Sequence, residues 1–520
     1  MTTSHIKRAL ISVSDKTGVV DLALKLKGFG VEIISSGGTR KVLEENGIEV
    51  TPIEDITGNP EAFGGRMKTL SFQVLSSLLF RRGHNGDEQT AKALGIVPID
   101  LVVCHLYPFQ EVLKKQGPLD ELIENIDIGG PTMLRAAAKN FISVTVCPDP
   151  KYYSELKDVL DTNNGQVSAD FRQIMALRTF RHCASYDAMI TAELEKRFQD
   201  THRSVFISTQ DSEQIRYGEN PQQNAWFHAS RADDKFGEVL QGKAMSYNNL
   251  WDADQAFRCA RDLLSLEPEK FGCVVVKHAN PCGLGLANES INSLTDAWAS
   301  DPISSFGSII CFTKEVDEQT ALFFKDKFVE VVMAPTFTPA ALNVFSKKKN
   351  LRLIRKAFHE NPDEVMIRSV DKGFLIQDED PFPGEELDWV SEIRPTQKDD
   401  ELWRFGLVAG KHLRSNAIAL VKRVEGRVRL IGAGMGNPNR VVSVKQAFEK
   451  AQEEGHSDFK EAVLVSDAFF PFDDNIKLAH SYGVETFIQP GGSLRDPDVL
   501  KTVKELGLKM AMTQTRHFRH

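Results

Sequence analysis

The sequence predicts an α/β protein built from parallel β-sheets that are covered by helices. In both halves of the chain, short apolar runs of strand length alternate with segments of helical periodicity, which is the pattern of such sheets. At roughly 150 residues per domain, 520 residues suffice for about two to four domains. The composition, with 41% apolar and 26% charged residues, is that of a globular protein with room for a large core.

The first region begins with strands and helices in alternation. The expected elements are strands over residues 9–13, 31–35 and 101–105 and helices over residues 19–27 and 41–46. In parallel sheets, ligands bind in the loops beyond the carboxyl ends of the strands. Two conspicuous segments, Ser12–Gly18 and Ser35–Thr39, lie in such loops, and we therefore expect a ligand there.

A long helix is expected over residues 171–198, and the polar stretch 200–213 that follows it lacks clear periodicity. We place a domain boundary there, which predicts domains of residues 1–200 and 201–520. The second region repeats the α/β pattern, with strands expected over residues 273–277, 308–312, 329–333, 463–466 and 486–489.

Charge and cysteine content narrow the classes of function. The formal net charge of −9 leaves no basic excess to neutralise a nucleic-acid backbone, so we expect no nucleic-acid partner. No apolar run approaches the roughly 18 residues of a membrane helix, and the start of the chain does not resemble a signal peptide. The seven cysteines are scattered and form no C-x-x-C pair, which argues against disulfides and structural zinc. We therefore expect a cytoplasmic protein without a membrane partner or a metal.

Four segments of the first region carry glycines, hydroxyls and fixed cations. They are Ser12–Gly18, Ser35–Thr39, Gly65–Thr69 and Asp127–Thr132, the last of which precedes a helix with Arg135 and Lys139. Glycines let backbone N–H groups approach an anion, and the start of a helix favours negative charge. Each segment alone is more often an ordinary capped turn or a surface feature, and none matches the P-loop or the dinucleotide motif. Together they favour a phosphorylated ligand.

The second region contains a sharper motif, K-H-A-N-P-C-G, which begins at Lys277 directly after a buried strand. The pair Lys277–His278 puts a cation and an acid–base group where ligands of such sheets bind, although a lone histidine is more often structural. Zinc deaminases combine H-x-E with a later P-C-x-x-C motif. Here Asn280 replaces the glutamate and Gly285 the second cysteine, so no metal is implied.

The order of these motifs resembles one family, the bifunctional purine biosynthesis enzymes that join AICAR transformylase to IMP cyclohydrolase. The segments that carry the resemblance occur in family order: S-V-S-D-K-T-G, S-G-G-T, G-R-M-K-T-L, L-Y-P-F, I-D-I-G-G-P, R-A-A-A-K-N, R-Y-G-E-N-P, K-H-A-N-P-C-G, S-D-A-F-F-P-F and P-G-G-S. They span essentially the whole chain. The resemblance implies an N-terminal methylglyoxal-synthase-like parallel-sheet domain and a transformylase region of two cytidine-deaminase-like α/β subdomains without zinc.

The resemblance also implies the last two steps of de novo IMP biosynthesis. Residues 201–520 would transfer a formyl group from 10-formyltetrahydrofolate, a co-substrate, to AICAR, which gives FAICAR and tetrahydrofolate. Residues 1–200 would close FAICAR to IMP with loss of water. The implied partners are thus AICAR, FAICAR, IMP and reduced folate, and the family is typically homodimeric.

For formyl transfer, the resemblance implies three catalytic residues, Lys277, His278 and Asn416. His278 suits a general base for the weakly nucleophilic AICAR amine, Lys277 would protonate the departing folate nitrogen or stabilise charge, and Asn416 would hold the formyl oxygen. The implied contacts are Arg216, Tyr217 and Arg516 to phosphate, Asn249, Phe306, Gly307 and Glu330 to AICAR, and Phe472, Asp474 and Asn475 to folate, with His520 also functional.

For cyclisation, the resemblance implies a second set of residues. The catalytic ones are Lys68, Tyr107, Asp127 and Lys139, and the nucleotide contacts are Ser12, Ser14, Lys16, Ser36, Gly37, Gly38, Thr39, Arg66 and Thr69. Because ring closure is intramolecular, we expect positioning and charge stabilisation to supply most of the acceleration.

The chain departs from the family pattern in three places. After G-R-M-K-T-L the family continues H-P-K-I-H-G-G, where this chain has Ser71–Ser77; the family's asparagine before L-Y-P-F is His105, and the histidine of G-E-N-P-H-Q is Gln222. The first two departures fall in the cyclohydrolase region, whose phosphate loops are intact. Two alternatives stay open: a transformylase whose N-terminal domain only binds nucleotide or serves assembly, and a non-enzymatic folate or nucleotide sensor. The presence of Lys277, His278 and Asn416 argues against the sensor.

Overall fold

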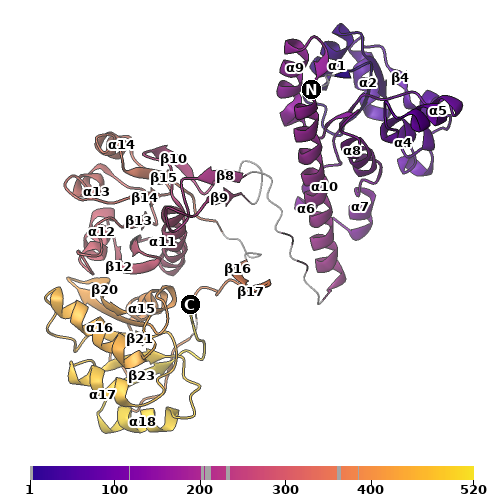
Figure 1. Cartoon of the computed structure of the whole chain (residues 1–520). Helices are drawn as coiled ribbons and strands as arrows, with labels where there is room; N and C mark the ends of the chain where they lie inside the picture. The colour runs from indigo at the N-terminus through magenta and orange to yellow at the C-terminus, as the bar shows by residue number, and fades with distance from the viewer. Residues whose placement is uncertain are drawn as a thin grey trace. The chain divides into compact units, whose positions relative to one another are not determined.

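The structure is a computed structural model that describes residues 4–115, 117–200, 204, 206, 212–229, 235–359, 365–384 and 386–520. The chain divides into two compact units (Figure 1). Unit 1 comprises residues 1–211 and 228–233, and unit 2 comprises residues 212–227 and 234–520. The boundary predicted after residue 200 adjoins residues 201–203, which lie outside the described part of the chain.

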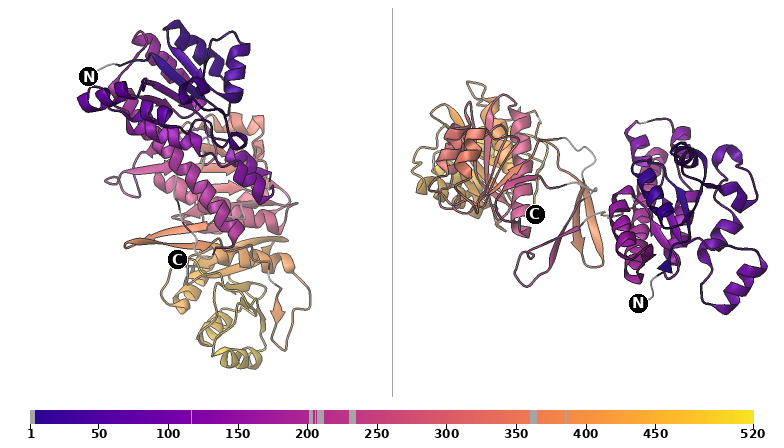
Figure 2. Two further views of the ribbon diagram at one scale, coloured as in Figure 1. Left: turned by 90° about the vertical axis from the view of Figure 1, so that its right-hand side faces the viewer. Right: turned by 90° about the horizontal axis from the view of Figure 1, so that it is seen from above.

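Unit 1 is built on a sheet in the order β4-β3-β2-β5-β6, in which every neighbouring pair is parallel. Its strands are β2 (Arg8–Ser12), β3 (Glu32–Ser35), β4 (Thr51–Pro52), β5 (Leu101–Cys104) and β6 (Thr145–Cys147), beside the antiparallel pair β1 (Ser4–His5) and β7 (Gln166–Val167). Its helices are α1 (Val19–Gly28), α2 (Gly37–Glu45), α3 (Ile53–Thr57), α4 (Phe72–Leu79), α5 (Asn85–Ala93), α6 (Phe109–Lys114), α7 (Leu119–Glu124), α8 (Gly129–Lys139), α9 (Tyr153–Thr162) and α10 (Ala169–Phe198), with 3₁₀ turns η1 (Phe63–Gly65) and η2 (Pro150–Tyr152). The long α10 packs against α8 and β6 (Figures 1 and 2).

The predicted strands of unit 1 are confirmed as β2, β3 and β5, and the predicted long helix is α10. One helix begins earlier than predicted, because α2 starts at Gly37 rather than at residue 41. Ser36 is extended, with φ −140° and ψ 160°, and is the N-cap of this helix. Gly37, Gly38 and Thr39 therefore form the first turn of a helix, which points its N–H groups toward the loop side of the sheet.

Unit 2 contains a twelve-stranded mixed sheet in the order β10-β15-β14-β13-β11-β12-β20-β19-β21-β22-β23-β18. Two consecutive segments build it with one and the same sequence of elements. The first is α11 (Tyr247–Leu266), β11 (Phe271–Lys277), β12 (Asn280–Ala287), α12 (Ser290–Trp298), β13 (Ile309–Phe312), α13 (Glu318–Phe323), β14 (Val331–Ala334), α14 (Pro339–Phe345) and β15 (Arg352–Arg355). The second is α15 (Asp400–His412), β19 (Ile418–Val424), β20 (Arg427–Gly434), α16 (Arg440–Glu453), β21 (Val463–Ser466), α17 (Asp474–Ser481), β22 (Thr486–Gln489), α18 (Asp496–Glu505) and β23 (Lys509–Met512).

These two repeats confirm the two α/β subdomains expected in the second region. Each opens with an antiparallel hairpin and continues with parallel strands, and β12 pairs with β20 antiparallel to join them. The strands β10 (Glu238–Gln241) and β18 (Asp388–Trp389) close the two edges of the sheet. Two hairpins, β8 (Ser212–Ile215) with β9 (Ala225–His228) and β16 (Val365–Val370) with β17 (Gly373–Asp378), form separate two-stranded sheets.

The helices of unit 2 lie on both faces of its sheet. Helices α11 and α15 pack against each other, and one apolar core beneath them runs through both repeats. On the opposite face, α12 to α14 and α16 to α18 cover separate cores. Alternate side chains of the same strand therefore enter different cores, as Val274 and Val275 of β11 do.

Glycines in the two central strands set how closely helices approach them. A Cβ on Gly283 or Gly285 of β12 would lie within 2.3 Å of a carbonyl oxygen of α12, at 1.9 Å from that of Ala297 and 2.3 Å from that of Ser293. Gly432 and Gly434 of β20 face α16 in the same way. The segment from Gly432 is thus a strand on which a helix packs closely, and not only a glycine-rich turn.

Replacing Gly283 by alanine should destabilise unit 2, because backbone atoms of α12 cannot move aside as a flexible side chain could. We expect a loss of about 1–3 kcal/mol in the free energy of unfolding, measured by urea denaturation. Gly373→Ala is the control, since a Cβ there meets no atom within 4 Å. Equal denaturation midpoints for the two variants would contradict this account of the packing.

Candidate active sites

The first site, in unit 1, lies at the carboxyl ends of β2, β3 and β5, where hydrogen bonds join three loops. Lys16 Nζ donates to Thr39 Oγ1 at 3.2 Å, and Thr39 Oγ1 donates to the carbonyl of Val13 at 3.0 Å. Ser14 Oγ donates to the carbonyl of Leu106 at 2.6 Å, which joins the loop after β5. Residues from three separate predicted motifs therefore meet at one edge of the sheet.

Two ammonium groups face the start of α2. Lys68 Nζ occupies the space that a side chain at Gly37 would fill, and it pairs with Glu61 at 2.9 Å. Burial lowers the pKa of Lys16, and the charge of Lys68 lowers it further. Like charges gathered at a helix N-terminus favour an anion, such as a phosphate, between them. The hydroxyl of Ser36 makes no capping bond to α2, so capping does not occupy it.

Asp127 organises the opposite side of this site. Its Oδ1 accepts from the backbone N–H of Gly130 at 2.8 Å, and the backbone N–H of Tyr107 also bonds to the carboxylate. Burial nevertheless raises the pKa of Asp127. Thr69 Oγ1 lies 2.7 Å from where a Cβ on Gly129 would be. The structure thus brings Thr69, Tyr107 and Asp127 together around the start of α8.

The structure also places three further predicted residues, Ser12, Arg66 and Lys139. Arg66 pairs with Glu124, and both side chains are exposed. Ser12 is the last residue of β2. Lys139 is the last residue of α8, whereas Asp127 precedes its start, so the eleven residues of the helix put about 15 Å between these two positions. Within one chain, Lys139 is therefore not beside the carboxylate of Asp127.

The two departures from the family pattern that fall in unit 1 have clear structural roles. The segment Ser71–Ser77 begins helix α4, with Ser71 Oγ accepting from the N–H of Val74 at 3.1 Å. His105 is 6% exposed, stacks on Tyr153 with ring centroids 5.5 Å apart, and its Nε2 lies 3.0 Å from the Tyr153 hydroxyl. Burial lowers the pKa of His105 to about 4, so the ring is neutral near pH 7.

The second site, in unit 2, begins at the hairpin turn after β11. Lys277 Nζ donates to the carbonyls of Phe306 and Gly307 at 3.0 and 3.1 Å, so three predicted residues meet here. His278 is exposed in the turn. Asn280 links the turn to the second repeat, because its Nδ2 donates to the His278 carbonyl at 3.0 Å and its Oδ1 accepts from the N–H of Arg414 at 3.3 Å.

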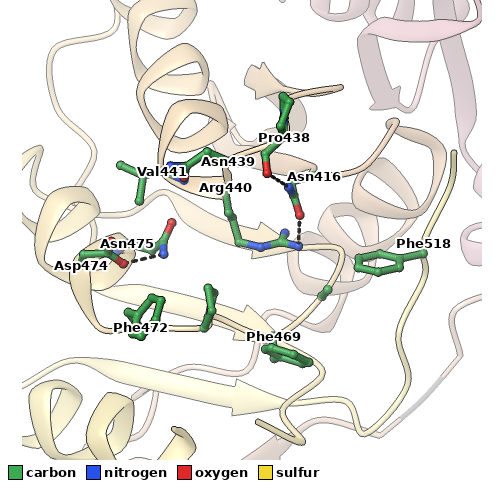
Figure 3. A pocket seen from close by; sticks show the side chains of 12 residues that line it. Asn416, Pro438, Asn439, Arg440, Val441, Phe469, Phe472, Asp474, Asn475 and Phe518 are labelled. Carbon is green, nitrogen blue, oxygen red and sulfur yellow. Dashed lines mark hydrogen bonds between the residues drawn. The ribbon is translucent and has the colours of Figure 1, made fainter.

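Asn416 follows two residues after Arg414 and lines a cavity of about 490 Å³ (Figure 3). The predicted folate residues Phe472, Asp474 and Asn475 line it too, together with Phe469 and Phe518. Asn475 is 1% exposed and its Nδ2 donates to Asp474 Oδ1 at 2.8 Å, while its Oδ1 is buried without a partner among the described residues. Aromatic walls with an unused acceptor and a carboxylate fit a flat heterocycle that carries N–H groups.

Sequence analysis missed Arg440, which also lines this cavity. Its Nη2 donates to Asn416 Oδ1 at 2.7 Å (Figure 3). Its Nη1 donates to Ser466 Oγ at 2.8 Å. Arg440 also pairs with Asp467, and both side chains are almost fully buried. The available signal was its position as the first residue of a helix after the glycine-rich segment 432–436.

The remaining predicted residues of unit 2 have local partners. Arg216 lies over the Tyr217 ring at 5.2 Å, and Asn248 Nδ2 ties the same segment to α11 through the carbonyl of Glu219 at 3.2 Å. Asn249 completes the capping box of α11 with Ser246.

Glu330, Arg516 and His520, which were also predicted as site residues, have partners in unit 2 as well. Glu330 pairs with Arg352 at 2.6 Å. Arg516 lies over Phe518 at 4.4 Å, and the backbone carbonyl of His520 accepts from Arg368 at 2.8 Å. The end of the chain is therefore folded onto unit 2 rather than frayed.

Comparison with known proteins agrees with this geometry. The family described as AICARFT/IMPCHase bienzyme matches residues 137–450, and the MGS-like domain matches residues 18–132. The bifunctional purine biosynthesis protein PurH of Persephonella marina is 41% identical over 99% of this chain and 100% of its own, and that of Anoxybacillus flavithermus is 42% identical over the same shares. The chain belongs to the AICARFT/IMPCHase family.

Membership of the AICARFT/IMPCHase family makes this chain a bifunctional purine biosynthesis enzyme, with AICAR transformylase and IMP cyclohydrolase activities. Its co-substrate is 10-formyltetrahydrofolate, and AICAR, FAICAR, IMP and reduced folate are its ligands. The predicted function is confirmed, and the two alternatives are not supported. A solved structure titled Crystal structure of ForH has 33% sequence identity over 38% of this chain and 100% of its own, with a TM-score of 0.33.

The described residues contain neither a cluster of metal ligands nor a membrane-spanning helix. In the ranges that the structure describes, no three histidine, cysteine, aspartate or glutamate side chains are grouped to hold a metal ion. Among the described helices, none combines the length and the apolar character that crossing a bilayer requires.

The neutral state of His105 predicts that unit 1 loses stability in acid. The ordinary pKa of histidine is 6.5 and that of folded His105 is about 4, so between these values the unfolded chain binds a proton that the folded chain does not. Stability therefore falls as pH falls, by about 2 kcal/mol between pH 7 and pH 5.

To isolate this effect, the native protein is compared with the His105→Asn variant, because the asparagine side chain does not titrate. Amide exchange of β5 in the full chain at both pH values measures the stability, and the contribution of the also buried His182 cancels between the two proteins. The variant should lose about 2 kcal/mol less than the native enzyme on going to pH 5. An identical loss in the two proteins would show that His105 is not the cause.

Proposed function

We propose that the two activities of this enzyme are divided between its units, with cyclisation in unit 1 and formyl transfer in unit 2. The convergence of loops from three strands on Lys16, Lys68 and Asp127 supports the first assignment. The cavity beside Asn416, with its aromatic walls and the unused acceptor of Asn475, supports the second. The corresponding domains are residues 1–200 and 201–520.

In formyl transfer, His278 accepts the proton that the AICAR amine loses as its nitrogen attacks the formyl carbon. The bond between the formyl carbon and the folate nitrogen then breaks, and Lys277 supplies a proton to that nitrogen or stabilises the charge that develops on it. The contacts of Lys277 with the carbonyls of Phe306 and Gly307 support this role, because they hold its ammonium group in one place beside His278. Arg216, Tyr217 and Arg516 bind the phosphate of AICAR.

Asn416 holds the formyl oxygen as negative charge develops on it. Its Oδ1 accepts from Arg440, which leaves Nδ2 pointing away from that guanidinium. Both Nδ2 protons are used in this structure, since Nδ2 donates to the carbonyls of Asn437 at 2.8 Å and Pro438 at 3.1 Å. The formyl oxygen therefore replaces one of these two carbonyls when Asn416 binds it.

In cyclisation, unit 1 holds the FAICAR phosphate between the start of α2 and the ammonium groups of Lys16 and Lys68. Asp127 and Tyr107 act on the reacting groups of FAICAR. The raised pKa of the Asp127 carboxyl suits it to exchange protons with these groups. Ring closure needs the formyl carbon held beside the carboxamide nitrogen, and the three tied loops supply a rigid frame for that. Lys139 lies at the far end of α8, so its position supports a role in this site less well than that of Lys68 does.

We further propose that the enzyme is a cytoplasmic homodimer. The hairpin β16–β17 projects from unit 2 (Figure 2) and pairs with no other described strand. It exposes apolar side chains on its surface, among them Ile367, Phe374, Leu375 and Ile376. A lone two-stranded hairpin is only marginally stable in water, so a second copy that covers it would stabilise it. The seven free cysteines suit a reducing compartment.

Replacing Lys68 by alanine tests the assignment of unit 1. We expect conversion of FAICAR to IMP to fall by about 10²-fold or more, because the phosphate and the developing charge lose a fixed cation. Formylation of AICAR by the same protein should stay within about twofold of native, and chromatography of the products measures both. Loss of both activities would contradict the division between units.

Replacing His278 by alanine is the complementary test. AICAR formylation should fall by about 10²–10⁴-fold, the usual contribution of a general base, while FAICAR still closes to IMP at the native rate. A formylation rate near that of the native enzyme would remove His278 from the mechanism.

A further inference from the structure

The turn that carries His278 has an unusual backbone. Strand β11 ends at Lys277 and β12 begins at Asn280, and these two residues are paired, so His278 and Ala279 form a two-residue hairpin turn. Both residues have positive φ, 51° and 59°. Such turns favour Asn-Gly or Gly-Gly, because a Cβ opposes positive φ. Histidine adopts this conformation more readily than most residues, but alanine has no such preference.

The second repeat offers an internal comparison. Its corresponding hairpin, between β19 and β20, turns at Glu425 and Gly426 with φ of 51° and 79°. The two turns share one conformation, and the second repeat uses the expected glycine where the first has Ala279. The first repeat therefore keeps a disfavoured residue beside His278, and contacts from elsewhere must stabilise the turn.

Asp252 on α11 supplies such contacts. Its Oδ1 accepts from the backbone N–H of Ala279 at 2.7 Å, and the backbone N–H of His278 also bonds to the carboxylate. The side chains of Lys277 and His278 lie near enough to this carboxylate for their positive charge to favour its ionised form. Burial raises the pKa of Asp252, as expected for a carboxyl withdrawn from water by the helix and the turn.

The carbonyl side of the turn is held separately. Asn280 donates to the carbonyl of His278 and accepts from the N–H of Arg414. Asp252 therefore holds the N–H groups of the turn, while Asn280 connects its carbonyl to the segment between α15 and β19 that contains Asn416. His278 itself is exposed in this turn.

We propose that Asp252 is a positioning residue for formyl transfer: it holds the His278–Ala279 turn in its disfavoured conformation and so aims the imidazole of His278 at the AICAR amine. The proposal rests on the assignment of His278 to that reaction. Asp252 touches no reacting atom, and its effect is exerted through the backbone.

The experiment compares Asp252→Ala with Asp252→Asn in the full chain. Asp252→Ala should lower kcat for AICAR formylation by about 10–100-fold, the cost of misplacing a reacting group, while KM for AICAR changes by less than about threefold. Asp252→Asn keeps an oxygen that accepts from the N–H of Ala279, so it should recover most of the lost kcat. Asp254→Ala is the matched control on the same helix, where the carboxylate pairs with Arg258 at 2.8 Å, and it should leave both activities unchanged.

The rate at which the same variants cyclise FAICAR shows whether a substitution has damaged the protein as a whole. A loss of formylation in Asp252→Ala, with native cyclisation and with rescue by Asp252→Asn, supports the proposal. Native kcat in Asp252→Ala, equal loss in both Asp252 variants, or a loss shared with cyclisation overturns it. His278→Ala separates the two hypotheses: if that variant keeps its activity, the proposed role of His278 fails, whereas if it is inactive and Asp252→Ala is native, only the role of Asp252 fails.

Discussion

The antiparallel pairing of β12 with β20 is the contact on which the organisation of unit 2 depends. In this register Gly285 faces Arg429 and Leu286 faces Val428, so the start of β12 lies beside the end of β20. The turn with His278 precedes that start, and the segment 435–440 follows that end. The pairing therefore brings the base from one repeat and the Asn416 cavity from the other to one edge of the sheet, across more than 130 residues of sequence.

Close helix packing and buried polar pairs stabilise this arrangement. The glycines of β12 and β20 let α12 and α16 pack closely on the two central strands where the repeats join. Between α11 and α15, Asp262 accepts from Lys411 and from His412 Nε2, both at 2.7 Å, and Arg519 donates to His412 Nδ1 at 3.0 Å. Burial lowers the pKa of His412 to about 4, so its neutral ring can accept that bond. Buried charges of this kind contribute little net stability, but they define where the end of the chain docks.

Unit 1 achieves the same convergence with parallel strands. All five strands of its sheet point the same way, so the loops after β2, β3 and β5 meet at one edge without any pairing between distant repeats. Helix α2 starts in the loop after β3, and the bond from the N–H of Tyr107 to Asp127 joins the start of α8 to the loop after β5. Both helix starts orient N–H groups toward the site. In both sites, the reactive groups therefore lie in loops at the ends of strands, and the sheet fixes the positions of these loops.

Local sequence determined much of this protein. Apolar runs of strand length predicted β2, β5 and β21, and glycines next to hydroxyls in Ser35–Thr39 and three other segments predicted a phosphorylated ligand. These signals depend only on neighbouring residues. The motif after a predicted strand singled out Lys277 and His278, and the resemblance added Asn416. Only the tertiary structure decided which residues stand behind them: Arg440 acts on Asn416 from a helix 24 residues away, and Asp252 reaches the His278 turn from 27 residues away. No local pattern records such partners, because hydrogen bonds between distant segments exist only after the strands have paired and the helices have packed on them.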